Sequence, residues 1–178
     1  VYGLGGNGLN KEASKKIYAA KGRPSDNPLI LHIADMEQFY PLIKTDNAKI
    51  IARAEALADV FWPGPLTMIL PKADNIPYET TGGLDTVAIR MPSHLVARAL
   101  LQECKMPIAA PSANLSGRPS PTSASHVIED MNGRIEMIID GGDVGIGVES
   151  TIIDLTGEVP MLLRPGFVTP EMLQFIVR

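Results

Sequence analysis

The sequence predicts an α/β fold: a single domain with a mixed parallel and antiparallel sheet and flanking helices. Amphipathic segments alternate along the chain with short apolar runs suited to buried strands. Two late apolar runs, 150–155 and 161–164, are joined by a turn at 156–158, which predicts an antiparallel hairpin. The 178 residues are 45% hydrophobic and 20% charged, enough for one domain with a sizeable core, to which we assign 1–178.

The first half of the chain predicts helices separated by short strands. Asn10 is a typical helix N-cap, and apolar residues recur on one face after it at Ala13, Ile17 and Ala20. A second helix stops at 62–65, because two prolines and a glycine cannot continue it. We predict, in order, a helix from Asn10, a strand at 29–33, a helical turn at 36–43, a helix at 47–61 and a strand at 66–70.

The second half continues the alternation, with no internal repeat or interdomain linker. Thr169 followed by Pro170 is typical of a helix start. We predict strands at 86–90, 107–110, 137–139, 151–155 and 161–163, and helices at 94–103, at 123–131 and from Pro170 onward.

Composition narrows the class of protein. One cysteine, Cys104, excludes an internal disulfide, and histidines scattered at 32, 94 and 126 lack the spacing of a zinc site. We assign Cys104, His94 and His126 structural or solvent-facing roles. No run is long and apolar enough to span a membrane, and a reducing, cytoplasmic setting fits best. A net charge of −4 argues against binding nucleic acid by bulk charge alone.

Two glycine-rich runs need separate interpretation. Residues 3–8 match G-x-G-x-x-G, but no strand precedes them and the best helix cap is Asn10, so we favour a tight turn over a dinucleotide loop. The run at 140–151 fits a flexible connector or a loop that folds over a ligand and presents Ser150. Its acidic residues match no calcium loop and are readily solvated: Asp140, Asp143 and Glu149.

Two polar segments carry the strongest chemical signals. In 21–29, Lys21 and Arg23 lie two residues apart and are followed by small hydrogen-bonding residues. Such cations neutralise phosphate, and a guanidinium grips its oxygens, although the same residues also fit a solvated helix end followed by a turn. The second segment, 111–119, is rich in serine and asparagine.

Together these segments resemble the YrdC family of threonylcarbamoyl-adenylate synthases. The resemblance is carried by VYGLGGN, KGRPSDNPLILHI, WPGPLT, VAIRMP, APSANLSG, GVESTIID and LLRPG, in the expected order from Val1 to Gly166. The family has a further Pro-Thr-Asp-Thr segment immediately before the position of Val1, whose last threonine contributes to the amino-acid pocket. We therefore expect either that an N-terminal segment is missing from this sequence or that the pocket is incomplete in it. The resemblance also implies a YrdC-like domain with a twisted sheet and an open central cleft.

The resemblance implies that L-threonine, bicarbonate or carbon dioxide, and ATP give threonylcarbamoyl-AMP and pyrophosphate. It further implies Mg²⁺ held by the phosphates, with no metal ligands from protein side chains. The product would feed modification of the adenosine beside the anticodon in tRNAs that read codons beginning with adenosine. Expected partners are therefore tRNA and the threonylcarbamoyl-transferase machinery, and no membrane. A carbamate oxygen can attack the α-phosphate of ATP without a side-chain nucleophile, so positioning and charge screening can supply the catalysis.

The resemblance also implies roles for individual residues. Four match the family's K-x-R and S-x-N pairs around triphosphate and carbamate: Lys21, Arg23, Ser112 and Asn114. Contacts to ATP are implied for Arg23, Asn27, Thr86, Ala110, Ser112, Ser120 and Arg164. Contacts to threonine are implied for His32, Arg90 and Ser150, with Arg90 gripping the α-carboxylate. We expect Lys21 and Arg23 to be exposed in a cleft.

Three alternatives stay open. A hydrolase would pair Ser112 or Ser150 with His32 or His126, but neither serine lies in a G-x-S-x-G elbow. A non-catalytic module could bind RNA or tRNA, against which the acidic net charge and 5% aromatic content count. A relative in hydrogenase maturation makes a carbamoyl adenylate from carbamoyl phosphate, but the extra zinc-finger and acylphosphatase-like segments of those proteins are absent from this sequence.

Overall fold

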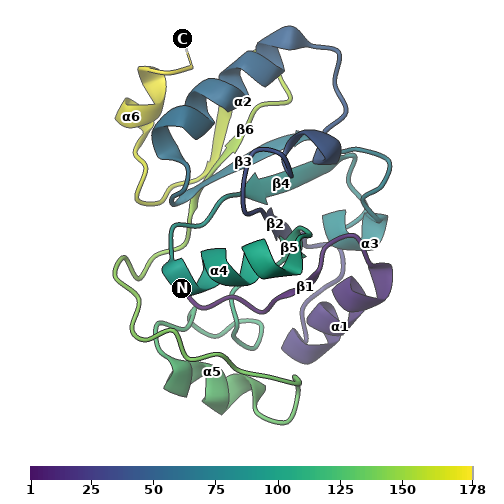
Figure 1. The fold of residues 1–178 in the computed structure, drawn as a ribbon, viewed down its shortest axis with the longest axis vertical. Coiled ribbons are helices and arrows are strands. Elements are labelled where there is room, and N and C mark those ends of the chain that lie inside the picture. Colours follow the sequence, from purple (N-terminus) through teal and green to yellow (C-terminus); the bar gives the residue numbers. More distant parts are fainter. Residues whose placement is uncertain (178) are drawn as a thin grey trace.

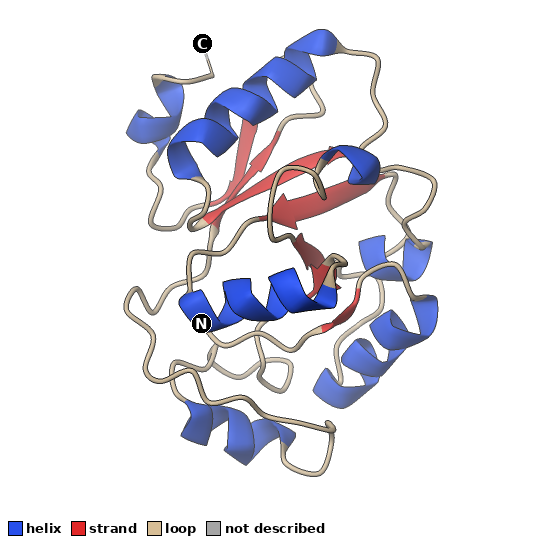
Figure 2. Cartoon of the chain, viewed as in Figure 1, coloured by secondary structure: helices blue, strands red, loops and turns tan. Residues whose placement is uncertain are grey.

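The computed structural model describes residues 1–177, which form a seven-stranded mixed sheet flanked by helices (Figures 1 and 2). The order across the sheet is β1-β5-β2-β4-β3-β6-β7. The strands are β1 (Gly6–Asn7), β2 (Ile30–His32), β3 (Leu66–Pro71), β4 (Thr86–Arg90), β5 (Ile108–Ala109), β6 (Thr151–Asp154) and β7 (Met161–Arg164).

The pairing of the strands confirms the predicted mixed sheet. The pairs β2–β4 and β3–β6 are parallel, whereas β1–β5, β2–β5, β3–β4 and β6–β7 are antiparallel. The last of these is the predicted hairpin. Because neighbouring strands come from distant parts of the chain, the sheet brings the N-terminal third beside residues 86–109 and the middle beside 151–164.

The helices begin where the sequence places their caps. Asn10 accepts hydrogen bonds from the backbone of Glu12 and Ala13, Asn47 accepts from Lys49, and Thr169 accepts from Met172. The helices are α1 (Lys11–Lys21), η1 (Tyr40–Leu42, a 3₁₀ helix), α2 (Ala48–Phe61), α3 (Tyr78–Thr81), α4 (Leu95–Cys104), α5 (Ala124–Met131) and α6 (Pro170–Gln174). Within 1–177, none of them has the length and hydropathy needed to cross a bilayer.

One face of the sheet forms the core and the other is partly open. Alternate residues of β4, Val87 and Ile89, are buried and belong to the same core cluster as Leu57 of α2. The residues between and beside them, including Ala88 and Arg90, are only partly buried. Polar side chains on this second face are therefore accessible to a ligand without disturbing the core.

Some sequence predictions were wrong or incomplete. No strand forms at 137–139, where the chain runs as a loop and Met137 is 73% exposed. An apolar run of three residues does not specify a strand, because strand formation also requires a free sheet edge beside it. The short elements β1 and α3 were not predicted, but the glycine-rich run at 3–8 forms no dinucleotide loop. It contributes β1 instead, where a side chain at Gly8 would strike Leu31.

Candidate functional site

Lys21 joins the two polar segments that the sequence singles out. It is the last residue of α1, and its Nζ donates to the backbone carbonyls of Ser112 and of Asn114, the latter at 2.6 Å. The K-x-R and S-x-N segments therefore meet, although they are about 90 residues apart in the chain. The expectation that Lys21 is exposed is wrong, since only 2% of the residue is accessible.

Burial perturbs the charge of Lys21. Desolvation lowers its pKa to about 8, and the positive charge of Arg23 lowers it in the same direction. Glu149 and Asp130 oppose this effect. Lys21 is thus a cation held at a fixed position inside the protein, within one pH unit or so of losing its proton under physiological conditions.

Arg23 follows a turn at Gly22, which ends α1 in the left-handed conformation at φ 60°. Its guanidinium is held by Asn27: Nη2 donates to Asn27 Oδ1 at 2.6 Å and Nε to the Asn27 carbonyl at 3.2 Å. Nη2 also donates to the carbonyl of Pro28 at 3.1 Å. Arg23 is partly buried, and the Asn27 side chain, for which the sequence predicts a nucleotide contact, orients this arginine.

The S-x-N segment offers both a hydroxyl and a buried acceptor. Ser112 is partly exposed, and its hydroxyl has no hydrogen-bond partner within 1–177. The Asn114 amide nitrogen donates to the carbonyls of Leu115 and Arg118 at 2.9 and 2.8 Å, which fixes the orientation of the amide. Its Oδ1 is buried and has no partner in the described part of the chain. A buried orphan acceptor is costly, so the segment has unmet capacity to bind a donor.

His32 and Arg90 lie side by side on the partly open face of the sheet, as register partners of β2 and β4. The Arg90 Nε donates to the carbonyl of Gly64 at 3.1 Å, and neither terminal nitrogen has a hydrogen-bond partner within 1–177. His32 Nδ1 lies 3.2 Å from the Ile30 carbonyl and therefore carries a hydrogen. Burial, assisted by the charge of Arg90, lowers the pKa of His32 to about 3, so the ring is neutral near pH 7.

Ser150, immediately before β6, and Arg164, the last residue of β7, form a second hydrogen-bonded unit. Arg164 Nε donates to the Ser150 carbonyl at 3.0 Å, and Nη2 donates to Ser150 Oγ at 3.1 Å. Ser150 Oγ also lies 2.7 Å from Thr67 Oγ1, and Ser150 is only 3% exposed. The charge of Arg164 lowers the pKa of Arg90, after the larger effect of burial, so the field of this unit reaches Arg90.

Glu149 is a site residue that the sequence interpretation missed. Its Oε1 accepts from Ser120 Oγ at 2.9 Å, and its Oε2 accepts from Arg164 Nη1 at 2.5 Å. The interpretation of Glu149 as an ordinary solvated charge is therefore wrong. Its position next to Ser150, inside the GVESTIID motif, was the available signal.

Thr86 and Ala110 are predicted site residues that are not part of the hydrogen-bonded groups described above. Thr86 is the first residue of β4, four positions before Arg90 and on the same face, which places it about 13 Å along the strand. Ala110 follows β5, and its backbone nitrogen donates to the Ile30 carbonyl at 2.9 Å. Neither Thr86 nor the Ala110 side chain hydrogen-bonds another of the predicted residues.

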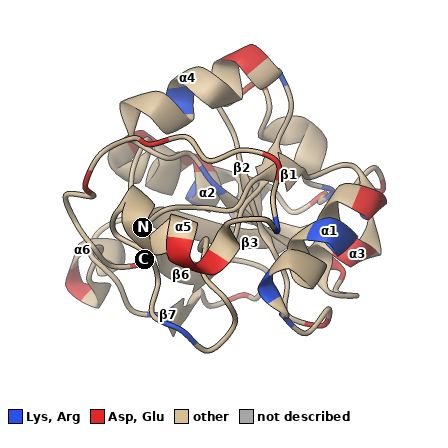
Figure 3. Ribbon diagram, turned by 90° about the horizontal axis from the view of Figure 1, so that it is seen from below, with Lys and Arg blue, Asp and Glu red and all other residues tan. Residues whose placement is uncertain are grey.

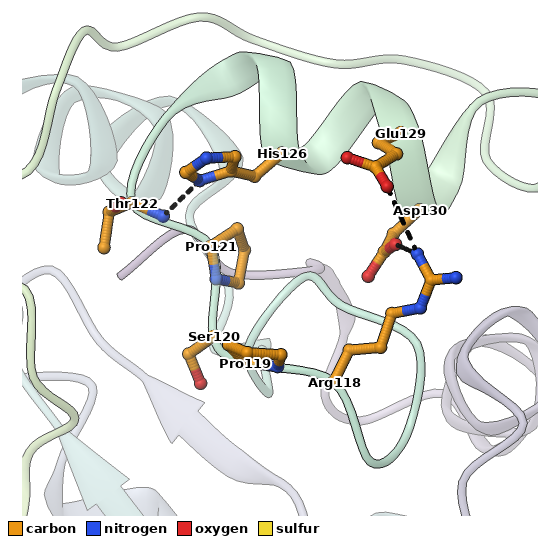
Figure 4. Close-up of a pocket in the computed structure, with 8 residues that line it drawn as sticks. All are labelled: Arg118, Pro119, Ser120, Pro121, Thr122, His126, Glu129 and Asp130. Carbon is orange, nitrogen blue, oxygen red and sulfur yellow. Dashed lines mark hydrogen bonds and ion pairs between the residues drawn. The ribbon is translucent and has the colours of Figure 1, made fainter.

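A pocket of about 330 Å³ borders the site at Ser120, the only predicted residue among those that line it (Figure 4). On one wall Arg118 donates to Asp130 at 2.6 Å, and Asp130 also accepts from the Leu115 backbone at 2.9 Å. On the other, the Thr122 backbone nitrogen donates to His126 Nδ1 at 3.4 Å. The pocket is lined by Arg118, Pro119, Ser120, Pro121, Thr122, His126, Glu129 and Asp130.

Charges elsewhere do not suggest a metal centre or a broad basic face. Within 1–177, no three His, Cys, Asp or Glu residues are grouped so that they could hold a metal ion. Segments with acidic and basic residues are interspersed along the ribbon in Figure 3, where α5 contains Glu129 and Asp130. The cations of the site are thus a local feature of a chain whose net charge is −4.

Comparisons with known proteins agree on one family. The model of the Sua5/YciO/YrdC family, described as "Telomere recombination", matches residues 1–166. The chain is 58% identical over 177 residues to a threonylcarbamoyl-AMP synthase of Pyrococcus abyssi and 56% identical over 178 residues to one of Bacillus subtilis. Each match covers 99% of this chain but only 51% and 50% of those proteins.

A solved structure gives the same result. The crystal structure of P. abyssi Sua5 complexed with L-threonine matches with a TM-score of 0.94 and 57% sequence identity. The match covers 99% of this chain and 51% of that chain. This chain therefore spans about half the length of the P. abyssi and B. subtilis relatives.

Proposed function

This chain belongs to the Sua5/YciO/YrdC family, and we propose from that premise that it forms L-threonylcarbamoyl-AMP and pyrophosphate from L-threonine, bicarbonate or carbon dioxide, and ATP. It would thus be a nucleotidyltransferase of the cytoplasm, and its product would serve modification of the adenosine next to the anticodon in tRNAs reading codons that begin with A. The names of its relatives and the threonine complex of P. abyssi Sua5 support the proposal.

One observation carries the proposal: Lys21 binds the carbonyls of the S-x-N segment and so fixes it beside the K-x-R segment. A triphosphate needs several cations in fixed positions, and preorganised charges cost no reorganisation during the reaction. Arg23 and Arg164 are held by their own hydrogen bonds nearby, and the field of Arg164 acts on Arg23. We assign these three cations to the phosphates, and the Ser112 hydroxyl to a phosphate or carbamate oxygen.

Threonine would bind on the open face of the sheet. The two terminal nitrogens of Arg90 match the two oxygens of a carboxylate, which favours a bidentate contact with the α-carboxylate. The buried hydroxyls of Thr67 and Ser150 and the neutral ring of His32 are suited to the polar end of the amino acid. These assignments leave the amine free to react.

The reaction can then proceed without a nucleophile from the protein. The threonine nitrogen attacks the carbon of CO₂ and loses a proton, giving a carbamate. A carbamate oxygen attacks the α-phosphorus of ATP, and the bond from that phosphorus to the pyrophosphate oxygen breaks. Both reactants are anions, so holding them together against their repulsion is the main task of the site.

Mg²⁺ is expected on the phosphates and would neutralise part of their charge. The described residues offer no carboxylate cluster to hold it, and the one carboxylate within the cation group, Glu149, is paired with Ser120 and Arg164. We therefore assign no protein ligand to the ion.

The geometry gives little support to the alternatives. Ser150 Oγ is bonded to Thr67 and Arg164 rather than to a histidine, and within 1–177 the Ser112 hydroxyl pairs with none, which argues against a hydrolase. The P. abyssi and B. subtilis relatives, at 58% and 56% identity, are named for threonylcarbamoyl-AMP, which favours threonine over carbamoyl phosphate. A module that only binds tRNA would not require the fixed cations or the two terminal nitrogens of Arg90, which have no hydrogen-bond partner within 1–177.

Pyrophosphate release from ATP tests the proposal. We expect release only when threonine and bicarbonate are both present. Arg90→Ala should raise the KM for threonine roughly 10- to 150-fold, because a charged hydrogen bond contributes about 1.5 to 3 kcal/mol, and leave the KM for ATP near its original value. Arg134→Ala, in an exposed loop, is the matched control. Release that does not depend on threonine, or that depends equally on serine and glycine, would overturn the assignment.

A further inference from the structure

The carboxylate of Glu149 accepts from the one guanidinium nitrogen of Arg164 that does not donate to Ser150. Arg164 is already anchored through Nε and Nη2, which donate to the carbonyl and the hydroxyl of Ser150. Nη1 donates to Glu149 at 2.5 Å. Arg164 therefore keeps two of its three contacts, and its orientation, without Glu149.

The field of Glu149 reaches the other cations of the site. Its charge raises the pKa of Lys21 and of Arg23, against the larger lowering caused by burial. One carboxylate thus lies among three groups that we assign to the triphosphate: Lys21, Arg23 and Arg164. The side chains of Glu149 and Arg164 are 38% and 33% exposed, so an incoming anion can reach the pair.

We infer that Glu149 is an internal counter-ion: it takes the place of an anionic group of the ligand and leaves Arg164 Nη1 when a phosphate binds there. This inference rests on the proposed function, because it takes the ligand to be a nucleoside triphosphate. Glu149 also lies near the end of the glycine-rich loop that begins at Asp140. Near the start of this loop, the backbone carbonyl of Gly142 accepts a hydrogen bond from the Tyr2 hydroxyl at 2.6 Å. Displacement of Glu149 would therefore release one attachment of this loop, which Val144 also holds through a hydrogen bond from its backbone nitrogen to the Thr122 carbonyl at 3.1 Å.

A purely supporting role for Glu149 predicts the opposite result. If the carboxylate served to orient Ser120 and Arg164 for ATP, its loss would weaken ATP binding. If it competes with the phosphates, its loss strengthens binding, because the cations then face ATP without an opposing charge. The sign of the change in affinity separates the two roles.

The test is calorimetric titration of ATP into the protein and into Glu149→Gln, which keeps the size of the side chain. We expect the dissociation constant for ATP to fall about three- to tenfold, the range suited to removing one partly screened charge, and its salt dependence to steepen. The matched control is Glu158→Gln, which makes the same change of charge at the exposed β6–β7 turn and should leave the affinity unchanged.

Glu149→Ala provides a second variant, with the same sign expected, and covers the case in which the glutamine variant does not fold. Unchanged or weaker ATP binding in a folded Glu149 variant would overturn the inference while leaving the proposed function intact. Failure of the unmodified protein to bind ATP would instead overturn the proposed function.

Discussion

At the scale of single residues, the charged groups of the site differ in how many hydrogen bonds they already make within the protein. Lys21 is committed to two carbonyls and is almost wholly buried, so it fixes the S-x-N segment as well as supplying charge. Arg90 has only one of its nitrogens committed, within the described residues, and its fork is free for a carboxylate. This difference is the reason why we assign phosphate to Lys21 and a carboxylate to Arg90.

The lowered pKa of Lys21 predicts opposite pH trends for activity and stability. Pyrophosphate release should fall as pH rises through about 8, because Lys21 then loses its charge. Its contribution to the free energy of unfolding should rise from about pH 8 toward pH 10.5, the ordinary pKa of a lysine, because the unfolded chain binds the proton more tightly.

These trends are measured by a pH–rate profile and by urea unfolding at pH 7.5 and pH 10. In the Lys21→Met variant, the pH dependence of pyrophosphate release near pH 8 and the rise in the free energy of unfolding above pH 8 should both be lost. If a folded Lys21→Met protein shows the same fall in pyrophosphate release near pH 8, a residue other than Lys21 causes it.

The sequence could predict which residues are polar and grouped in motifs, but not how they are paired. Glu149 was read as a solvated charge because nothing local indicates Ser120 and Arg164 as its partners, 29 and 15 residues away. Likewise, the position of Lys21 at the end of α1 favoured exposure, since its burial depends on a segment about 90 residues later.

At the scale of helices and strands, the sequence predicts an element correctly where its stabilising hydrogen bonds join residues close together in the chain. Asn10, Asn47 and Thr169 cap helices through bonds within three residues, so the sequence predicts those starts correctly. The run at 137–139 was predicted as a strand and is not one, because pairing depends on neighbours that a local pattern cannot specify.

A buried hydroxyl pair predicts how α1, α3 and β1 are held together. Thr80 Oγ1 donates to the Gly8 carbonyl at 2.9 Å and accepts from Ser14 Oγ at 2.8 Å, and both hydroxyl-bearing residues are fully buried. We expect Thr80→Val to lower the free energy of unfolding by about 1 to 3 kcal/mol, because it leaves two buried polar groups unpaired.

Urea denaturation measures this change. Thr122→Val is the control, because the Thr122 hydroxyl has no hydrogen-bond partner within 1–177 and should alter stability by less than about 0.5 kcal/mol. Equal stability of the Thr80→Val and unmodified proteins would mean that the network contributes nothing net.

At the scale of the whole molecule, the sheet assembles the site from segments that are far apart in sequence. Residues from β2 and β4 present His32 and Arg90, the hairpin of β6 and β7 presents Arg164, and the end of α1 meets the segment after β5. The alternation of elements predicts the fold class. It does not predict the order β1-β5-β2-β4-β3-β6-β7, because strand pairing is a non-local choice.

The central claim is that this one face joins a carbamate of threonine to the α-phosphate of ATP. Incubation with ¹³C-bicarbonate, L-threonine and ATP, followed by mass spectrometry of the nucleotide products, tests it most directly. The account predicts a threonylcarbamoyl adenylate that carries one ¹³C atom and disappears when threonine is omitted. An adenylate without the label, or AMP formed equally without threonine, would contradict it.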